Sequence, residues 1–277
     1  MQVVGKDISA EERWTQIAET YLKNVSGPYH AHRKTVIKSL YKDLDLSGKT
    51  VLDFGCGEGN ILKDLFAFNI TKAYGIDIND ELLNYAKQNL NKLSNIELLK
   101  GNVDHLKKIE SESIDLALAL NVIGYFSNSD ENLFYKEINR VLRKNGTLIV
   151  CHSNQLFDLY TFNRHTVNFF EKYFDTDARK IEALITNPQA PQKISANIRE
   201  NPLSYKFKMN NFGFVEEKQA FANYHEMPPL LMEERLFIKD INDRVYQDTT
   251  NWPDEEKWKL FFQCSMFASR LRLEQKL

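Results

Sequence analysis

The stretch VLDFGCGEGN, residues 51–60, decides the fold that we expect for this chain of 277 residues. Its first half is short and mostly apolar, which is typical of a buried parallel strand. Three glycines follow at alternate positions, and a helical pattern runs from there to residue 69. Glycine permits backbone conformations that other residues avoid, and it lets a ligand approach the main chain closely. The stretch therefore predicts a strand, a ligand-binding turn and a helix.

Strands and helices continue to alternate on both sides of this turn. Further strands are predicted at 73–77, 96–101, 114–120 and 147–152, with helices at 80–93 and 131–143. After residue 152 the alternation stops, and the later predictions are a helix over 202–211 and strands over 214–224 and 261–273. This order predicts an α/β fold of Rossmann type, a mostly parallel sheet sandwiched by helices.

The ends of this pattern suggest additions to the α/β unit. Residues 8–46 show two amphipathic helical runs with a break at 26–28, so residues 1–46 are predicted to form a helical lid. The α/β domain then spans 47–277, with helical lid insertions at about 155–200 and 228–259.

Composition excludes several classes of protein. Hydrophobic residues make up 43% and charged residues 27%, which are ordinary globular values. A net charge of −2 without a basic stripe argues against a nucleic-acid partner. Three widely spaced cysteines predict neither a disulfide framework nor a metal site, and no signal peptide or membrane span is visible. We expect a cytoplasmic monomer or homodimer.

The acid before the first glycine indicates the charge of the ligand. Asp53 would repel the pyrophosphate of a dinucleotide, and Asn60 stands where a dinucleotide-binding loop has its third glycine. A cationic ligand suits this loop better. S-adenosylmethionine carries an ammonium and a sulfonium and has no phosphate, so the loop favours it over NAD.

Two more acids follow strand ends at matching positions. Asp77 closes the second strand in GIDI (75–78), where a carboxylate can accept both ribose hydroxyls. Asp104 follows the third strand in GNVD (101–104), where a carboxylate can accept the adenine amino group.

With these motifs the chain resembles the class I S-adenosylmethionine-dependent methyltransferases. The resemblance rests on DFGCGEGN, GIDI, GNVD and LRKNGTLIV (142–150) and covers about residues 45–152, more loosely the remainder. It implies seven strands with one antiparallel strand at the end. It also implies a set of cofactor-binding residues, which here are Asp53, Gly55, Cys56, Gly57, Asp77, Ile78, Asn102, Val103, Asp104, Asn121, Tyr29 and Arg33.

Methyl transfer to a hydroxyl is helped by a base, and histidine is the usual choice near neutral pH. His152 and His225 follow predicted strands at the ligand-binding edge, and His165 lies in the first insertion. We expect one of these three to contact a small-molecule substrate. The loose likeness of the C-terminal part to polysaccharide and natural-product methyltransferases favours oxygen as the acceptor.

Other functions stay open. The acceptor atom could be nitrogen or carbon, in which case a histidine base matters less. A non-catalytic cofactor-binding or scaffold protein would bind without turnover, and a nicotinamide oxidoreductase would need the third glycine that Asn60 replaces.

Overall fold

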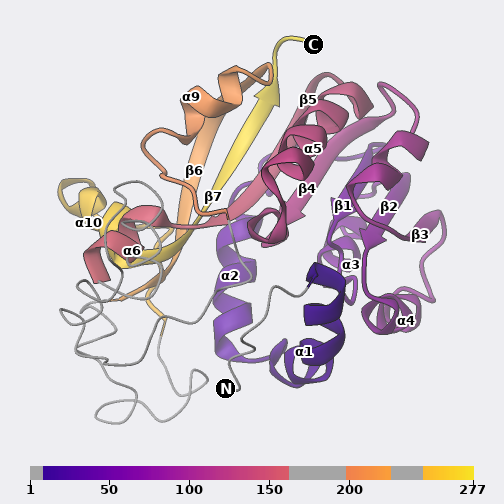
Figure 1. Ribbon diagram of the computed structural model, residues 1–277, viewed down its shortest axis with the longest axis horizontal. Helices are drawn as coiled ribbons and strands as arrows, with labels where there is room; N and C mark the ends of the chain where they lie inside the picture. Colours follow the sequence, from indigo (N-terminus) through magenta and orange to yellow (C-terminus); the bar gives the residue numbers. More distant parts are fainter. Residues whose placement is uncertain (1–8, 162–197, 226–245) are drawn as a thin grey trace.

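The seven strands form one sheet in the order β3-β2-β1-β4-β5-β7-β6. The computed structural model describes residues 9–161, 198–225 and 246–277, and Figure 1 shows helices on both faces of this sheet. The strands are β1 (Thr50–Phe54), β2 (Lys72–Asp77), β3 (Ile96–Lys100), β4 (Ile114–Leu120), β5 (Leu142–Ser153), β6 (Phe214–Tyr224) and β7 (Cys264–Leu273).

The directions of the strands match the predicted fold. β1 pairs in parallel with β2 and β4, and the pairs β2–β3 and β4–β5 are also parallel. β7 runs antiparallel to both of its neighbours, β5 and β6. The Rossmann-like, mostly parallel seven-stranded sheet is therefore confirmed.

Two helical layers bury the two faces of the sheet. Successive strand residues point to opposite faces, so Leu52 packs in one core cluster and Val51 in the other. The helices are α1 (Ala10–Asn24), α2 (Pro28–Lys38), α3 (Asn60–Phe66), α4 (Asp80–Asn89), η1 (Val103–Lys108), η2 (Ile123–Tyr125), α5 (Asn128–Val141), α6 (Gln155–Thr161), α9 (Tyr205–Asn210), η4 (Asp254–Glu256) and α10 (Lys257–Gln263). α5, α9 and η1 contribute to the first cluster, and α2, α3 and α4 contribute to the second.

Several element boundaries differ from the sequence prediction, and β5 begins at Leu142 instead of residue 147. α5 begins three residues earlier than expected because Ser127 and Asp130 form a capping box that satisfies the first free amides. The last strand begins three residues later than expected. Residues 261–263, which we predicted to be extended, finish α10 instead, where Phe261 packs against Phe221 of β6.

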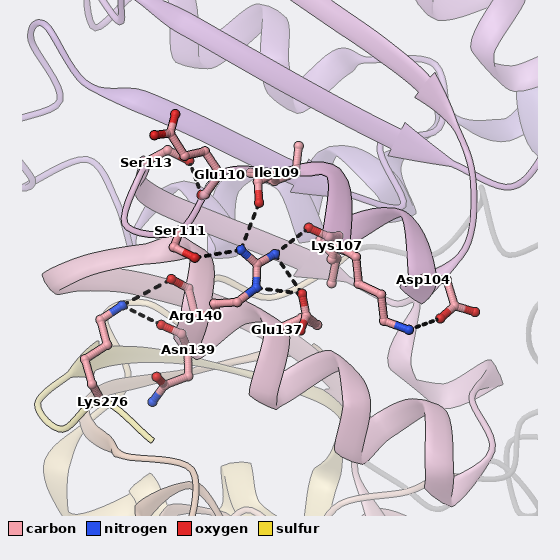
Figure 2. Close-up of polar contacts among 11 residues, drawn as sticks. Asp104, Lys107, Ile109, Glu110, Ser111, Ser113, Glu137, Asn139, Arg140 and Lys276 are labelled. Atoms are coloured by element: carbon pink, nitrogen blue, oxygen red, sulfur yellow. Dashed lines mark hydrogen bonds and ion pairs between the residues drawn. The ribbon is translucent and has the colours of Figure 1, made fainter.

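A polar network closes the end of the sheet opposite the strand carboxyl ends (Figure 2). α5 passes directly into β5, so the last carbonyls of the helix need donors from elsewhere. Lys276 donates to the carbonyl oxygens of Asn139, Arg140 and Leu142. Arg140 donates to the carbonyls of Leu106 and Ile109 and pairs with Glu137. The C-terminal segment and η1 are thereby fastened to α5.

The predicted lid and insertions are only partly within the described residues. α1 and α2 confirm the two helical runs of the N-terminal segment, and Figure 1 places them below the ends of the strands. Of the insertion at 155–200 the structure describes α6 and residues 198–200. Of the insertion at 228–259 it describes residues 246–259. The division into a lid and a domain stays a prediction.

Candidate active site

The glycine loop is tied to the end of β2. The backbone amides of Gly55 and Cys56 both donate to the carbonyl of Ile76, at 2.7 and 3.0 Å. Gly55 has φ +79°, and a Cβ there would lie 3.0 Å from the Cβ of Val122. Gly57 has φ +53° and its amide donates to Asp77. Side chains at these two positions would strain the loop. Glycine avoids this strain and lets a ligand approach the backbone closely.

Asp77 holds this loop in place. One of its carboxylate oxygens accepts the Gly57 amide at 2.8 Å, and the other accepts the Asn79 amide at 2.9 Å. The side chain is buried, and this burial raises the pKa of Asp77, although the amides of Asn79, Gly57 and Ile78 oppose the change. Asp77 therefore lies where the sequence predicted it, at the junction of the loop and β2.

Two further buried carboxylates lie beside Asp77. Asp53 is 2% exposed, and burial together with the charges of Asp77 and Glu58 raises its pKa to about 8. Glu58 is 5% exposed, and its Oε1 accepts the Asn60 amide at 2.6 Å. Its Oε2 is buried and accepts no hydrogen bond from the described residues. Burial is also the first cause that raises the pKa of Glu58.

These three carboxylates favour a cationic ligand. The described residues place no lysine or arginine in an ion pair with Asp53, Glu58 or Asp77, so hydrogen bonds alone oppose their mutual repulsion. Buried charges without partners are costly, and a bound cation would remove that cost. An ammonium and a sulfonium are such cations, so the residues present fit S-adenosylmethionine.

Aromatic side chains of α1 and α2 roof this loop. The Tyr21 hydroxyl lies beside the Glu58 carboxylate and 3.8 Å from the place of a Cβ on Gly57. Tyr21 belongs to a chain of aromatic rings whose neighbouring centroids are 5.1 to 5.8 Å apart, with Tyr125 at one end and His32 at the other. Its members are Tyr125, Trp14, Tyr21, His30, Tyr29, Tyr246 and His32, and we call them the aromatic roof.

Arg33 and Asn121 lie near the ends of β4 and β5. The Arg33 guanidinium stacks over the Tyr29 ring at 5.1 Å, and its charge also acts on Cys151. The Cys151 thiol donates to Oδ1 of Asn121 at 3.1 Å. Asn121 has φ +60° and is exposed, so it faces open space at the carboxyl end of β4.

The segment predicted to hold adenine begins η1. Asp104 is exposed and forms an ion pair with Lys107 at 2.7 Å, as Figure 2 shows. Asn102 accepts the Asp104 amide at 3.1 Å, and Val103 is buried at the start of η1. Asn102, Val103 and Asp104 stay the proposed cofactor residues of this segment.

The predicted histidines need a correction. His152 stands on β5, but its ring packs between Tyr205 and Phe267 and is 3% exposed. Alternate strand residues face opposite sides, so it points away from the face where its neighbour Cys151 meets Asn121. Burial lowers the pKa of His152 to about 3. This placement does not suit a residue that contacts the acceptor.

The other two histidines have different outcomes. His225 follows β6, is buried and packs its ring on Phe157 of α6 at 4.8 Å. Its backbone amide donates to the Gln263 carbonyl at 2.8 Å. His165 lies outside the described residues.

Sequence reasoning missed Glu58, which the structure places among the buried acids. Its position between two loop glycines was a usable signal, because a side chain there starts next to the ligand surface. The nearness of Tyr21 to Glu58 had no local signal, because α1 and the loop are far apart in the chain.

Neither a metal centre nor a membrane span occurs in the described ranges. They contain no group of three or more His, Cys, Asp or Glu side chains suited to a metal ion. None of their helices has both the length and the apolar character needed to cross a bilayer.

Comparisons with known proteins agree with this geometry. A demethylmenaquinone methyltransferase of Lactococcus lactis is 29% identical over 189 residues, which are 63% of this chain and 72% of the relative. An S-adenosylmethionine-dependent methyltransferase of Archaeoglobus fulgidus has a TM-score of 0.56 at 16% identity, covering 91% of this chain and 99% of the other. The magnesium protoporphyrin IX methyltransferase of Synechocystis PCC 6803, solved with bound S-adenosylhomocysteine (SAH), has a TM-score of 0.55 at 12% identity, with coverages of 95% and 97%.

The family comparison covers more than half of the chain. The model of the family described as "Methyltransferase domain" matches residues 45–225, a range that includes the glycine loop, Asp77 and Asn121. The chain therefore belongs to the methyltransferase-domain family and is an S-adenosylmethionine-dependent methyltransferase.

Proposed function

We propose that this enzyme methylates an oxygen of a small-molecule acceptor. S-adenosylmethionine supplies the methyl group, already activated by its bond to a positively charged sulfur. The protein therefore has to align donor and acceptor and keep water out. The observation that supports this proposal most strongly is the group of three buried, unneutralised carboxylates under an aromatic roof.

We assign the cofactor contacts to the loop and the strand ends around it. Asp53 and Glu58 would attract the ammonium, and Gly55, Cys56 and Gly57 would line the methionine portion. Asp77 and Ile78 would hold the ribose, and Asn102, Val103 and Asp104 the adenine. In support, Asp77 is held by two backbone amides, and the unpartnered Glu58 oxygen is buried beside the loop.

The aromatic roof supports a small acceptor. Tyr21 lies over the glycine loop, and further rings of α1 and α2 contact it, so we propose an enclosed site that a folded protein would not enter. Several relatives are named for small acceptors, among them demethylmenaquinone and a fatty acid. The free, buried cysteines agree with a reducing compartment, and we propose the cytoplasm.

The residue that removes a proton from the acceptor stays a proposal. Of the three histidines predicted from sequence, His225 is the one that follows a strand in the described region without lying between core aromatic rings. We propose it for acceptor contact.

Calorimetric titration tests the cofactor assignment. We expect saturable binding of S-adenosylmethionine and SAH, weakened at least about tenfold in Asp53→Asn and Asp77→Asn because each loses a charge that faces the ligand. Asp80→Asn, an exposed acid on α4, is the matched control and should bind normally. Equal affinity in all four proteins would contradict the assignment.

Transfer of labelled methyl groups tests the acceptor assignment. Matched hydroxyl and amine compounds are offered to the wild-type enzyme. Products with new methyl ethers or esters are expected, whereas products methylated only on nitrogen would contradict the choice of oxygen.

A further inference from the structure

Arg33 is a half-buried cation without a carboxylate partner. Its guanidinium stacks on Tyr29, and the side chains on which its charge acts are Tyr29, Cys151, Tyr21 and Tyr125. Among the described residues no acid pairs with it. A guanidinium withdrawn from water in this way favours an anion, which it can bind through two parallel hydrogen bonds.

The charge of Arg33 reaches two parts of the site. It acts on Cys151 of β5, which is aligned with Leu120, the last residue of β4. It also acts on Tyr21, whose hydroxyl lies beside Glu58 at the glycine loop. Arg33 is therefore within electrostatic reach of both the glycine loop and the ends of β4 and β5.

Asn121 adds a second hydrogen-bond donor at the end of β4. Its Oδ1 accepts the Cys151 thiol, which directs the Nδ2 group away from Cys151. Nδ2 donates to no acceptor within the described ranges, and the residue is exposed at the carboxyl end of β4. Its backbone is in the left-handed region, with φ +60°, a conformation that asparagine adopts more readily than most residues.

Charge is therefore divided across the site. Carboxylates line the side of β1 and β2, the Asn121 amide lies at the end of β4, and the Arg33 guanidinium is within electrostatic reach of both sides. A cationic amine would find its partners on the cofactor side only. A group rich in lone pairs would find hydrogen-bond donors at Arg33 and Asn121.

We infer that the acceptor carries an ionised oxygen group, such as a carboxylate or phenolate, which Arg33 binds with the Asn121 amide as a second donor. Cys151 acts as a positioning residue that orients Asn121. This inference rests on the proposed function and specifies its acceptor. It gives Arg33 a contact with the acceptor in place of the cofactor contact that the resemblance implied, which would be with the cofactor's carboxylate.

The first measurement separates these two roles of Arg33. SAH and 5′-methylthioadenosine, which lacks the amino-acid part, are titrated into the wild type, Arg33→Gln, Arg33→Lys and Lys34→Gln. Lys34 is a more exposed cation on the same helix and is the matched control. SAH should bind all four proteins within about twofold. Loss of SAH affinity in Arg33→Gln, with methylthioadenosine unaffected, would overturn the inference.

The second measurement tests the acceptor itself. Acids and their amides (4-hydroxybenzoate, 4-hydroxycinnamate and octanoate) are titrated into each SAH complex. At least one acid should bind the wild type about tenfold or more tighter than its amide. Arg33→Gln should abolish this preference, and Arg33→Lys should retain part of it. Acids that bind no tighter than their amides overturn the inference, whereas failure of SAH to bind the wild type overturns the proposed function instead.

Discussion

Tyr21 of α1 lies directly over Gly57 of the glycine loop, with its hydroxyl oxygen 3.8 Å from the place of a Cβ on that glycine. The same hydroxyl is next to the buried Glu58 carboxylate. One side chain thus connects the N-terminal helix to the ligand surface. Its removal should lower the affinity for the ligand more than the stability of the fold.

Tyr21→Ala should weaken SAH binding about tenfold, because the site loses the ring that shields the loop from water. Tyr21→Phe keeps the ring and should lose about threefold, through the hydroxyl alone. Calorimetry measures both, and Tyr85→Ala, an exposed tyrosine on α4, is the control. Wild-type affinity in Tyr21→Ala would show that α1 does not cover the ligand.

Binding of S-adenosylmethionine should release protons near neutral pH. The pKa of Asp53 is raised to about 8 in the free protein, so the carboxyl is mostly protonated there. A bound cation favours the charged form and expels the proton. Titration in two buffers of different ionisation enthalpy measures the release, which Asp53→Asn should reduce. Affinity should rise with pH up to about 8, and a flat profile would contradict this account.

The same acids should make the free protein less stable as pH rises. The unfolded pKa of an aspartate is about 3.9, whereas the folded pKa of Asp53 is about 8. Between these values the folded state holds more protons than the unfolded state, so the free energy of unfolding decreases as pH increases. Glu58 and Asp77 are shifted in the same direction. Melting temperatures of the free protein and of Asp53→Asn across this range check the sign, and the variant should show the shallower slope.

Lys208 should be essential to stability rather than to cofactor binding. Its ammonium pairs with the buried carboxylates of Glu131, at 2.6 Å, and Glu200. Lys208→Met would leave both acids buried without a cation, at a cost of about 3–5 kcal/mol in the free energy of unfolding. Urea unfolding measures this, with Lys206→Met as the exposed control. Because burial raises the pKa of Glu200 to about 7 and the loss of the Lys208 cation would raise it further, the loss of stability should be greater at high pH.

The sequence predicted the framework of the site because its signals are local. The run of β4 was predicted at its true bounds, and the loop glycines and Asp77 were placed correctly, since apolar runs and glycine turns depend on neighbours in the chain. Phe261 could not be assigned to α10 from its own neighbourhood, because a short apolar run suits a strand and a helix equally well.

The errors at the site arise from contacts that the chain makes over long distances. His152 was assigned to the correct strand, but its face depends on register, and one residue of difference turns a side chain to the other side of the sheet. The pairing of Lys208 with Glu131 joins residues from two helices and left no trace in the sequence pattern.

The position of β7 has a consequence for synthesis of the protein. β7 is inserted between β5 and β6, although it follows both in the chain. A nascent chain that has just completed β6 has no neighbour for that strand, and the edge of β5 stays open. Exposed edges and apolar faces of this kind promote aggregation. We therefore expect the growing polypeptide to need protection by chaperones until β7 has left the ribosome and the last gap in the sheet is filled.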